Sequence, residues 1–414
     1  MIGGIIVLVF LVTFGLFLSD AESVTWKWWD EIEPIIYDDD YIIDKFVGGL
    51  ERPVAMTFVG DDILVIEKET GRVIQITRNG ISYKEPVLDV PVAFKWEAGL
   101  LGIASLSDHV FLYFTESLSN SDQWEIENAR NVVYQYDWNG EKLINPILIK
   151  ELPAFDTNHF GGVIATGLNN EIYFTLGDLR QFGIYQNIIS GDNVIEAGVI
   201  YKIDTEKNNK AEIVAMGIRN SFGLALDPIT GYLWDTENGP DAYDEINLVE
   251  TKFNSGWAKI QGPSNGKLLP QLPNYEEYEY SEPEFSWELP IGVTAIEFPN
   301  SKMFEKYENF VFVADVNNGN IYKFKLDDTR TKFIFESPYL QDNVLNILEN
   351  SEDAAFSGDI GCLMSGIPCY EFDPMDEILF GKNFGMISDM KFGPDGALYV
   401  ISLMEGKIYR ITLG

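Results

Sequence analysis

The sequence predicts an all-β fold, a single six-bladed β-propeller over residues 41–414, from three observations. An internal repeat relates the first and last parts of this body. Between them, short runs of β-forming residues recur, separated by turns rich in Asp, Asn and Gly. Long stretches with the 3.6-residue apolar period of amphipathic helices are absent. Repeated strand units of this kind build a propeller.

The repeat aligns Met56–Ile76 with Met390–Ile411 after one residue is inserted. Each copy reads as a strand, an Asp/Gly turn, a second strand, a turn with glycine and a third strand, which is the meander of one blade. Shorter units follow the same order at Val163–Phe174, Leu224–Trp234 and Ile296–Val313. The alternative is another all-β fold, such as a β-sandwich, in which the similarity is accidental.

Composition favours a large soluble body. Of 414 residues, 46% are hydrophobic and 14% aromatic, and 36 are glycine. The net charge of −36, from 65 acidic and 29 basic residues, argues against nucleic acid or anionic lipid headgroups as partners. It indicates a well-solvated acidic surface, or one that attracts divalent cations.

The amino terminus reads as a targeting segment. Residues 2–18 are apolar or small without interruption and would span roughly 26 Å as a helix. Residues 1–22 therefore predict either a signal peptide cleaved near Ser19–Ala21 or a single membrane anchor. Residues 23–40 follow as an acidic and aromatic linker. Either alternative places the body outside the cytoplasm.

The only two cysteines, Cys362 and Cys369, share one loop. A disulfide between them is expected, since an oxidising compartment preserves such bonds. Two unpaired thiols are the alternative.

Two loops carry the candidate chemistry. The first, Asn158–Gly162, contains His159, one of two histidines, and a strand after it ends at Asp178. Histidine suits general-base chemistry at neutral pH, and a carboxylate can orient its ring. The second histidine, His109, follows Asp108 between two apolar runs and reads as a surface turn residue.

The second loop region, Gly217–Asn247, places a Gly-Arg-Asn turn before a strand pair and a Glu-Asn-Gly-Pro loop. Together the two regions resemble the glucose/sorbosone dehydrogenase family, whose soluble members are six-bladed quinoproteins that use pyrroloquinoline quinone (PQQ) and calcium. The resemblance implies that His159 is the general base of sugar oxidation and that Asp178 orients it.

The same resemblance implies a cofactor site. Arg219 and Asn220 match the family's Arg-Asn pair, which contacts the quinone, and a guanidinium suits a planar anionic partner. Gly239 and Pro240 match the step whose backbone carbonyls bind calcium, a cation that prefers oxygen. Two further matches, Glu97–Ala104 and Phe253–Trp257, read as architectural segments.

Three positions depart from the PQQ-binding pattern. Phe222 stands where the family has glutamine, and Asn317 where it has lysine. The family's Arg-x-Arg-Asp segment reads Met386–Asp389. Relative to the family, these changes remove three cationic contacts and one amide that would bind the cofactor.

Three functions follow as alternatives. The first is an extracytoplasmic PQQ- and calcium-dependent dehydrogenase of small sugars. The second is a catalytically degenerate propeller that acts as a binding module of the cell envelope. The third is a calcium-dependent hydrolase or lactonase, since propellers also support such chemistry with a channel metal.

Overall fold

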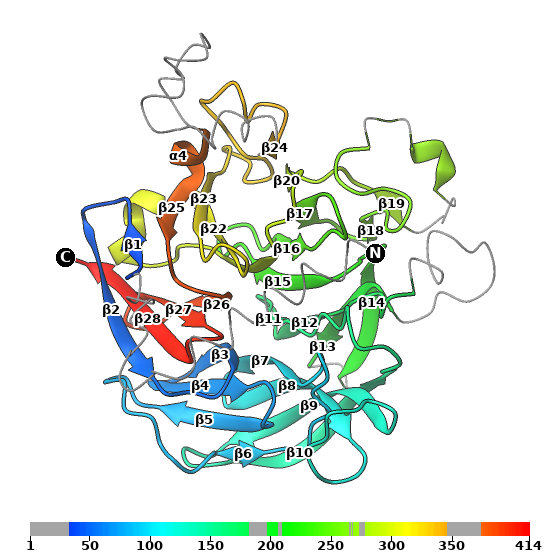
Figure 1. The fold of residues 1–414 in the computed structure, drawn as a ribbon, viewed down its shortest axis with the longest axis vertical. Helices are drawn as coiled ribbons and strands as arrows, with labels where there is room; N and C mark the ends of the chain where they lie inside the picture. The colour runs from blue at the N-terminus through cyan, green and yellow to red at the C-terminus, as the bar shows by residue number, and fades with distance from the viewer. Residues whose placement is uncertain are drawn as a thin grey trace, which may run out of the picture. The chain divides into compact units, whose positions relative to one another are not determined.

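The strands of the computed structural model form six sheets arranged around a common centre (Figure 1). The structure describes residues 33–181, 197–205, 209–264, 266, 268–272, 278–345 and 374–414. Each sheet contributes one innermost strand, and each of these contacts the next around a closed ring. In ring order they are β3 (Pro53–Val59), β7 (Leu100–Leu106), β11 (Ile164–Thr166), β15 (Ser221–Leu226), β21 (Val293–Glu297) and β26 (Ile387–Phe392). The predicted six-bladed propeller is confirmed.

We number the sheets as blades 1 to 6 in this order. Blades 1 and 2 are four-stranded meanders. Blade 1 continues with β4 (Asp62–Glu67), β5 (Arg72–Ile76) and β6 (Leu88–Asp89). Blade 2 continues with β8 (His109–Ser117), β9 (Ala129–Trp138) and β10 (Leu143–Leu152).

Blades 3 to 5 carry additional short strands beyond the first four. Blade 3 adds β12 (Glu171–Leu176), β13 (Val199–Asp204), β14 (Lys210–Met216), β18 (Phe253–Asn254) and β19 (Glu279–Tyr280). Blade 4 adds β16 (Leu233–Glu237), β17 (Asp244–Val249), β20 (Phe285–Trp287) and β24 (Val344–Leu345). Blade 5 adds β22 (Phe310–Asp315), β23 (Ile321–Lys325), β25 (Leu379–Lys382) and β1 (Ile35–Ile36).

Blade 6 closes the ring with strands from both ends of the described chain. It adds β27 (Leu398–Ser402), β28 (Lys407–Leu413) and β2 (Tyr41–Gly48), and β2 pairs antiparallel with β28. The described helices are short: η1 (Leu269–Gln271), η2 (Lys302–Tyr307) and α4 (Pro374–Ile378). Within the segment predicted as a linker, β1 already pairs with β25.

Apolar packing joins each blade to the next. The core divides into six clusters of buried side chains, one at each blade interface. Strand β4 shows why: Ile63 and Val65 pack towards blade 6, whereas Leu64 and Ile66 pack towards blade 2. Successive side chains of a strand point to opposite faces, and both faces of a blade are covered. Its strands therefore read as continuous apolar runs.

A buried ion pair fastens blade 4 to blade 5. Arg330, after β23, donates from Nε and Nη2 to the two carboxylate oxygens of Asp227, after β15, at 2.6 and 2.9 Å. Its Nη1 also donates to the backbone carbonyl of Glu308 at 3.0 Å. The two side chains are only 6% and 0% exposed.

We expect Arg330→Ala to lower the free energy of unfolding by about 3–5 kcal/mol, because it leaves the buried Asp227 charge without a partner. Arg410→Ala is the control, since Arg410 pairs with the exposed Asp44 at the surface and should cost less than about 1 kcal/mol. Denaturant unfolding measures both. Equal losses of unfolding free energy in the two variants would show that the Arg330–Asp227 ion pair does not stabilise the contact between blades 4 and 5.

Two predicted features lie outside the described residues: the signal or anchor segment 1–22, and the disulfide between Cys362 and Cys369. No helix in the part of the chain that the structure describes is long and apolar enough to cross a membrane.

Candidate functional site

The starts of the inner strands lie on one rim of the ring, together with the turns between second and third strands. His159 precedes β11, and Asp178 follows β12 in the same blade. Arg219 and Asn220 precede β15 in the next blade. All four meet on this rim, which confirms that loops conspicuous in the sequence share one face.

His159 and Asp178 form a buried pair. The Nδ1 atom of His159 lies 2.6 Å from Oδ1 of Asp178, and the residues are 7% and 3% exposed. This contact occupies Nδ1, so Nε2 is the nitrogen that can exchange a proton with a substrate. Backbone bonds fix the pair, because Leu179 N donates to the His159 carbonyl and Asp178 N to the Arg219 carbonyl. The predicted orienting role of Asp178 fits this geometry.

The backbone around the pair is strained. His159 has φ of 62°, and Leu179 and Arg180 have φ of 50° and 56°. Residues other than glycine rarely adopt a positive φ, and those that do cluster at functional sites. Gly177 permits the close approach, since a Cβ there would lie 2.2 Å from the His159 carbonyl oxygen.

Trp257 and Arg219 extend the pair. The indole Nε1 of Trp257 donates to Oδ2 of Asp178 at 2.6 Å, and the Arg219 guanidinium lies 5.4 Å from the Trp257 ring centroid. Arg219 donates from Nη1 to the Asn238 carbonyl at 2.7 Å. Its Nε is buried and has no hydrogen-bond partner among the described residues, and burial lowers the pKa of the guanidinium. The arrangement favours an acceptor or anionic ligand.

Glu97 ties three blades together beneath the pair. Its carboxylate accepts hydrogen bonds from His159 N at 2.7 Å, from Asn158 Nδ2 at 3.2 Å and from Asn220 Nδ2 at 3.1 Å. Asn220 Oδ1 in turn accepts from Gly161 N at 3.2 Å. Both ends of the Asn220 amide are thus engaged within the protein, so its clearest role is to hold the histidine loop.

The interpretation of Glu97 and Trp257 as architectural was therefore incomplete. Both precede or follow strands at the same rim as His159, and both bond directly to the pair or its loop. Their position at that rim, a polar or aromatic side chain beside glycines, is the signal that could have identified them.

Gly239 and Pro240 lie in the loop between β16 and β17. A Cβ on Gly239 would lie 2.2 Å from the carbonyl oxygens of both Ala242 and Tyr243, so this loop concentrates backbone oxygen. The Asp244 carboxylate is already used: it accepts backbone N–H groups of Gly239 and of residues 291–293 at 2.6 to 3.3 Å. No cluster of three or more His, Cys, Asp or Glu side chains suited to a metal occurs among the residues described.

Blade 4 buries three carboxylates beside this loop. Glu237 accepts from Arg219 N and Ser255 Oγ, each at 2.6 Å, and burial raises its pKa to about 7. Burial also raises the pKa values of Asp235 and Glu245 well above their usual range. These groups favour the protonated state in the folded protein.

Because burial raises the pKa of Glu237, its contribution to the stability of the folded protein falls as the pH rises. The folded-state pKa of Glu237 exceeds its ordinary value of 4.5, so the folded chain binds the proton more tightly than the unfolded chain. The contribution is fully present below about pH 4.5 and is lost by about pH 7, a change of up to about 3 kcal/mol. We expect the melting temperature in EDTA to drop between pH 5 and pH 8, and Glu237→Gln to reduce that slope. A slope of the opposite sign would contradict the assignment.

Among the described residues, the positions that depart from the PQQ-binding pattern present no cation on this rim. Phe222 is half-buried and Asn317 exposed. Ser388 Oγ donates to the Pro53 carbonyl at 3.3 Å, and the Asp389 carboxylate accepts from Met56 N at 2.9 Å. The nearby Lys391 is paired with Glu297 at 3.1 Å. The departures read from the sequence are therefore departures of the folded site.

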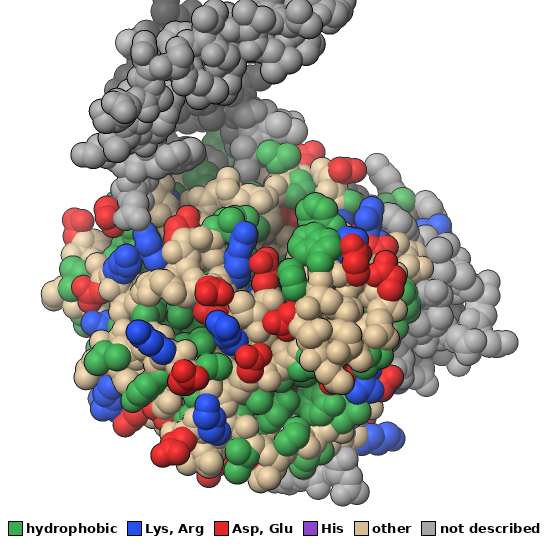
Figure 2. Space-filling view, turned by 60° about the horizontal axis from the view of Figure 1, so that its bottom comes forward, with side chains coloured by type: hydrophobic (Ala, Val, Ile, Leu, Met, Phe, Trp, Pro, Cys, Tyr) green, Lys and Arg blue, Asp and Glu red, His purple; other side chains and the backbone are tan. Residues whose placement is uncertain are grey.

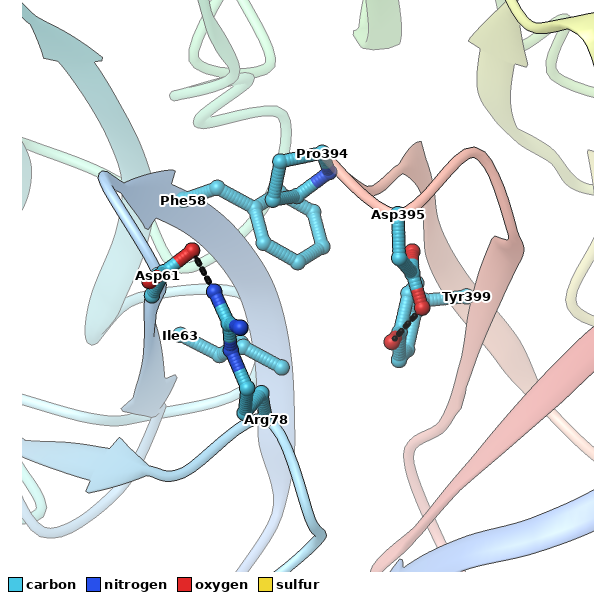
Figure 3. A pocket seen from close by; sticks show the side chains of 7 residues that line it. All are labelled: Phe58, Asp61, Ile63, Arg78, Pro394, Asp395 and Tyr399. Atoms are coloured by element: carbon cyan, nitrogen blue, oxygen red, sulfur yellow. Dashed lines mark hydrogen bonds and ion pairs between the residues drawn. The ribbon is translucent and has the colours of Figure 1, made fainter.

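Among the described residues, two adjoining cavities lie on the other rim, at the far ends of the inner strands. One, of about 290 Å³, lies between the first turns of blades 1 and 6 and is lined by Phe58, Asp61 and Tyr399 among others (Figure 3). The adjoining one, of about 580 Å³, opens towards blade 5. Neither includes a residue of the His159 site. Acidic and basic side chains are interspersed over the face drawn in Figure 2. The second histidine, His109, pairs with Asp137 on the surface at 2.9 Å.

Comparison with known proteins identifies the family. The family model described as Glucose / Sorbosone dehydrogenase matches residues 50–347. The chain is 27% identical over 184 residues to the aldose sugar dehydrogenase YliI of Escherichia coli, covering 42% of this chain and 50% of that protein. It is 25% identical over 251 residues to quinoprotein glucose dehydrogenase B of Acinetobacter calcoaceticus, covering 52% of each. The matches thus span about half the length of these two relatives.

The fold is shared with solved structures. The PQQ-bound aldose sugar dehydrogenase of Streptomyces coelicolor superposes with a TM-score of 0.61 over 91% of this chain and 99% of that one, at 19% identity. With the family match over residues 50–347, these findings show that the protein belongs to the glucose/sorbosone dehydrogenase family, an oxidoreductase family of β-propellers.

Proposed function

We propose that this protein is an extracytoplasmic dehydrogenase of aldose sugars that uses PQQ and calcium. The observation that carries the proposal is the buried pair of His159 and Asp178, at 2.6 Å, on the rim that also holds Arg219. Family membership supports the redox chemistry, and two relatives are named for sugar or glucose oxidation.

The chain's own residues would act on the proton. His159 Nε2 would take the proton of the C1 hydroxyl, while Asp178 holds Nδ1 and stabilises the imidazolium that forms. Trp257 fixes the other oxygen of Asp178, which keeps the carboxylate from rotating away. PQQ, when bound, supplies an electrophilic carbonyl that accepts the hydride from C1.

The residues fit this cofactor at one end. The Arg219 guanidinium is half-buried on this rim and suits a planar, anionic quinone, so Arg219 would hold it. The carbonyl oxygens of Gly239 and Pro240 would bind calcium, consistent with the oxygen-rich loop around them. Phe222 replaces the family's glutamine, and Asn317, Met386 and Ser388 replace its cations, so we expect PQQ to bind more weakly.

The absence of these cofactor contacts favours a second candidate function, a binding module of the cell envelope that keeps the propeller fold but catalyses no redox reaction. In both cases we propose that residues 1–22 direct or anchor the body outside the cytoplasm, on the strength of their uninterrupted apolar sequence.

Turnover separates the two candidates. Protein supplied with excess PQQ and calcium should reduce an artificial electron acceptor in an aldose-dependent manner, and omission of PQQ should abolish the reaction. If a folded sample, verified by circular dichroism, shows no aldose-dependent reduction at millimolar PQQ, the dehydrogenase proposal fails and the binding module remains.

A further inference from the structure

An exposed aromatic cluster borders the His159 site. Phe94, Trp96 and Trp124, which we call the aromatic platform, lie with the Trp96 and Trp124 ring centroids 6.2 Å apart and those of Phe94 and Trp124 5.7 Å apart. Trp96 is 64% exposed and Trp124 47% exposed. Two neighbouring indoles left this open to water are unusual, because large aromatic side chains gain most from burial.

The chain holds the platform in place rather than leaving it loose. Residues 92–94 exchange backbone hydrogen bonds with Gln123, and Lys95 pairs with Glu125, so the loops that carry Trp96 and Trp124 are joined. Trp96 itself has φ of 55°, a costly conformation for a bulky residue. Lys68 Nζ donates to its carbonyl at 2.7 Å and helps to maintain that conformation.

The platform is continuous with the site. Trp96 directly precedes Glu97, and consecutive Cα atoms are about 3.8 Å apart. The Glu97 carboxylate bonds to the His159 backbone at 2.7 Å, and Glu97 N donates to the carbonyl of Thr157, in the histidine loop. Trp96 therefore adjoins, on the same rim, the segment that holds the histidine loop.

The chemistry of the platform selects the occupant. Indole faces pack against the C–H faces of pyranose rings, and the Lys95–Glu125 ion pair beside them offers polar groups to sugar hydroxyls. The flanking carboxylates and the net charge of −36 disfavour an anionic ligand. An uncharged saccharide longer than one ring satisfies both features.

We propose that the aromatic platform is a subsite for the second sugar ring of an oligosaccharide whose reducing end lies at His159. This inference rests on the proposed function and narrows its substrate class from aldoses in general to oligosaccharides. It assigns specificity to Trp96 and Trp124, and no chemical step to either.

Direct binding tests the subsite independently of turnover. Glucose and a glucose trisaccharide are titrated against the protein without PQQ, by saturation-transfer NMR and indole fluorescence. We expect the trisaccharide to bind roughly 3- to 10-fold more tightly than glucose, and Trp96→Ala to bring that ratio close to one. Trp96→Phe, which keeps a ring, should retain most of the preference. Tyr232→Ala, an exposed aromatic (44%) on the opposite rim, should leave it unchanged.

The outcomes separate this inference from the proposed function. Equal affinity for the two sugars, or a preference that survives both Trp96→Ala and Trp124→Ala, overturns the subsite. Loss of the preference in Phe58→Ala would instead place the sugar in the opposite-rim cavity and overturn it as well. A preference that depends on Trp96, in a protein that oxidises no sugar, supports the subsite while the dehydrogenase proposal fails.

Discussion

Replacing His159 with alanine is expected to lower kcat/KM for aldose oxidation by about 10²–10⁴-fold, the range that a positioned general base contributes. The imidazole is buried, its Nδ1 is held by Asp178 at 2.6 Å, and its loop is fixed by Glu97. Removal of the ring leaves no other described imidazole on this rim. The measurement is steady-state reduction of an artificial acceptor with excess PQQ and calcium.

The chain provides a matched control in its only other histidine. His109 also pairs with an aspartate, at 2.9 Å from Asp137, but its side chain is 48% exposed and lies on the opposite rim, at the start of β8. His109→Ala should leave kcat/KM unchanged. Comparable losses in the two variants would indicate a general effect on folding or loading, and would remove His159 as the base.

Restoring the missing cations is expected to have the second large effect. Met386→Arg with Ser388→Arg recreates the family's Arg-x-Arg-Asp pattern ahead of Asp389. Met386 is 36% exposed and Ser388 half-buried, so longer side chains can reach out from this rim. Each charge-assisted contact to a cofactor carboxylate contributes about 1.5–3 kcal/mol, so PQQ affinity should rise at least about tenfold per arginine.

Charge alone must be separated from position in that experiment. Ile229→Arg adds a cation to a residue that is 57% exposed in the first turn of blade 4, on the opposite rim. It should change PQQ affinity little. If the double variant binds PQQ no more tightly than the original chain, the missing arginines at residues 386 and 388 do not limit PQQ affinity. The proposed position of the cofactor carboxylates is then wrong.

The ring could be predicted because its information is local. Met56–Ile76 and Met390–Ile411 repeat one strand unit, and their strands occupy equivalent places as β3–β5 and β26–β28. Short apolar runs with Asp/Gly turns mark each blade. Once the blades form a ring, the starts of inner strands converge, so His159 and Arg219, 60 residues apart in the numbering, share one rim.

What could not be predicted depends on contacts between blades. The family match at Glu97–Ala104 marks the segment, but it does not indicate that Glu97 accepts hydrogen bonds from the loops of His159 and Asn220. The pairing of Arg330 with Asp227 and the use of Asp244 by backbone amides likewise require the assembled ring. Sequence patterns identify the strands, but which side chains link neighbouring blades depends on how the blades pack in the assembled ring.

The most direct test of the site is a calorimetric titration of the protein with PQQ in excess calcium, with Arg219→Ala in parallel. We predict saturable binding at one site per chain, weakened at least about tenfold in the variant, because the half-buried Arg219 guanidinium would pair with the cofactor and a charged hydrogen bond contributes about 1.5–3 kcal/mol. Equal affinity in both proteins, or no binding by a folded sample at millimolar PQQ, would contradict the quinoprotein site.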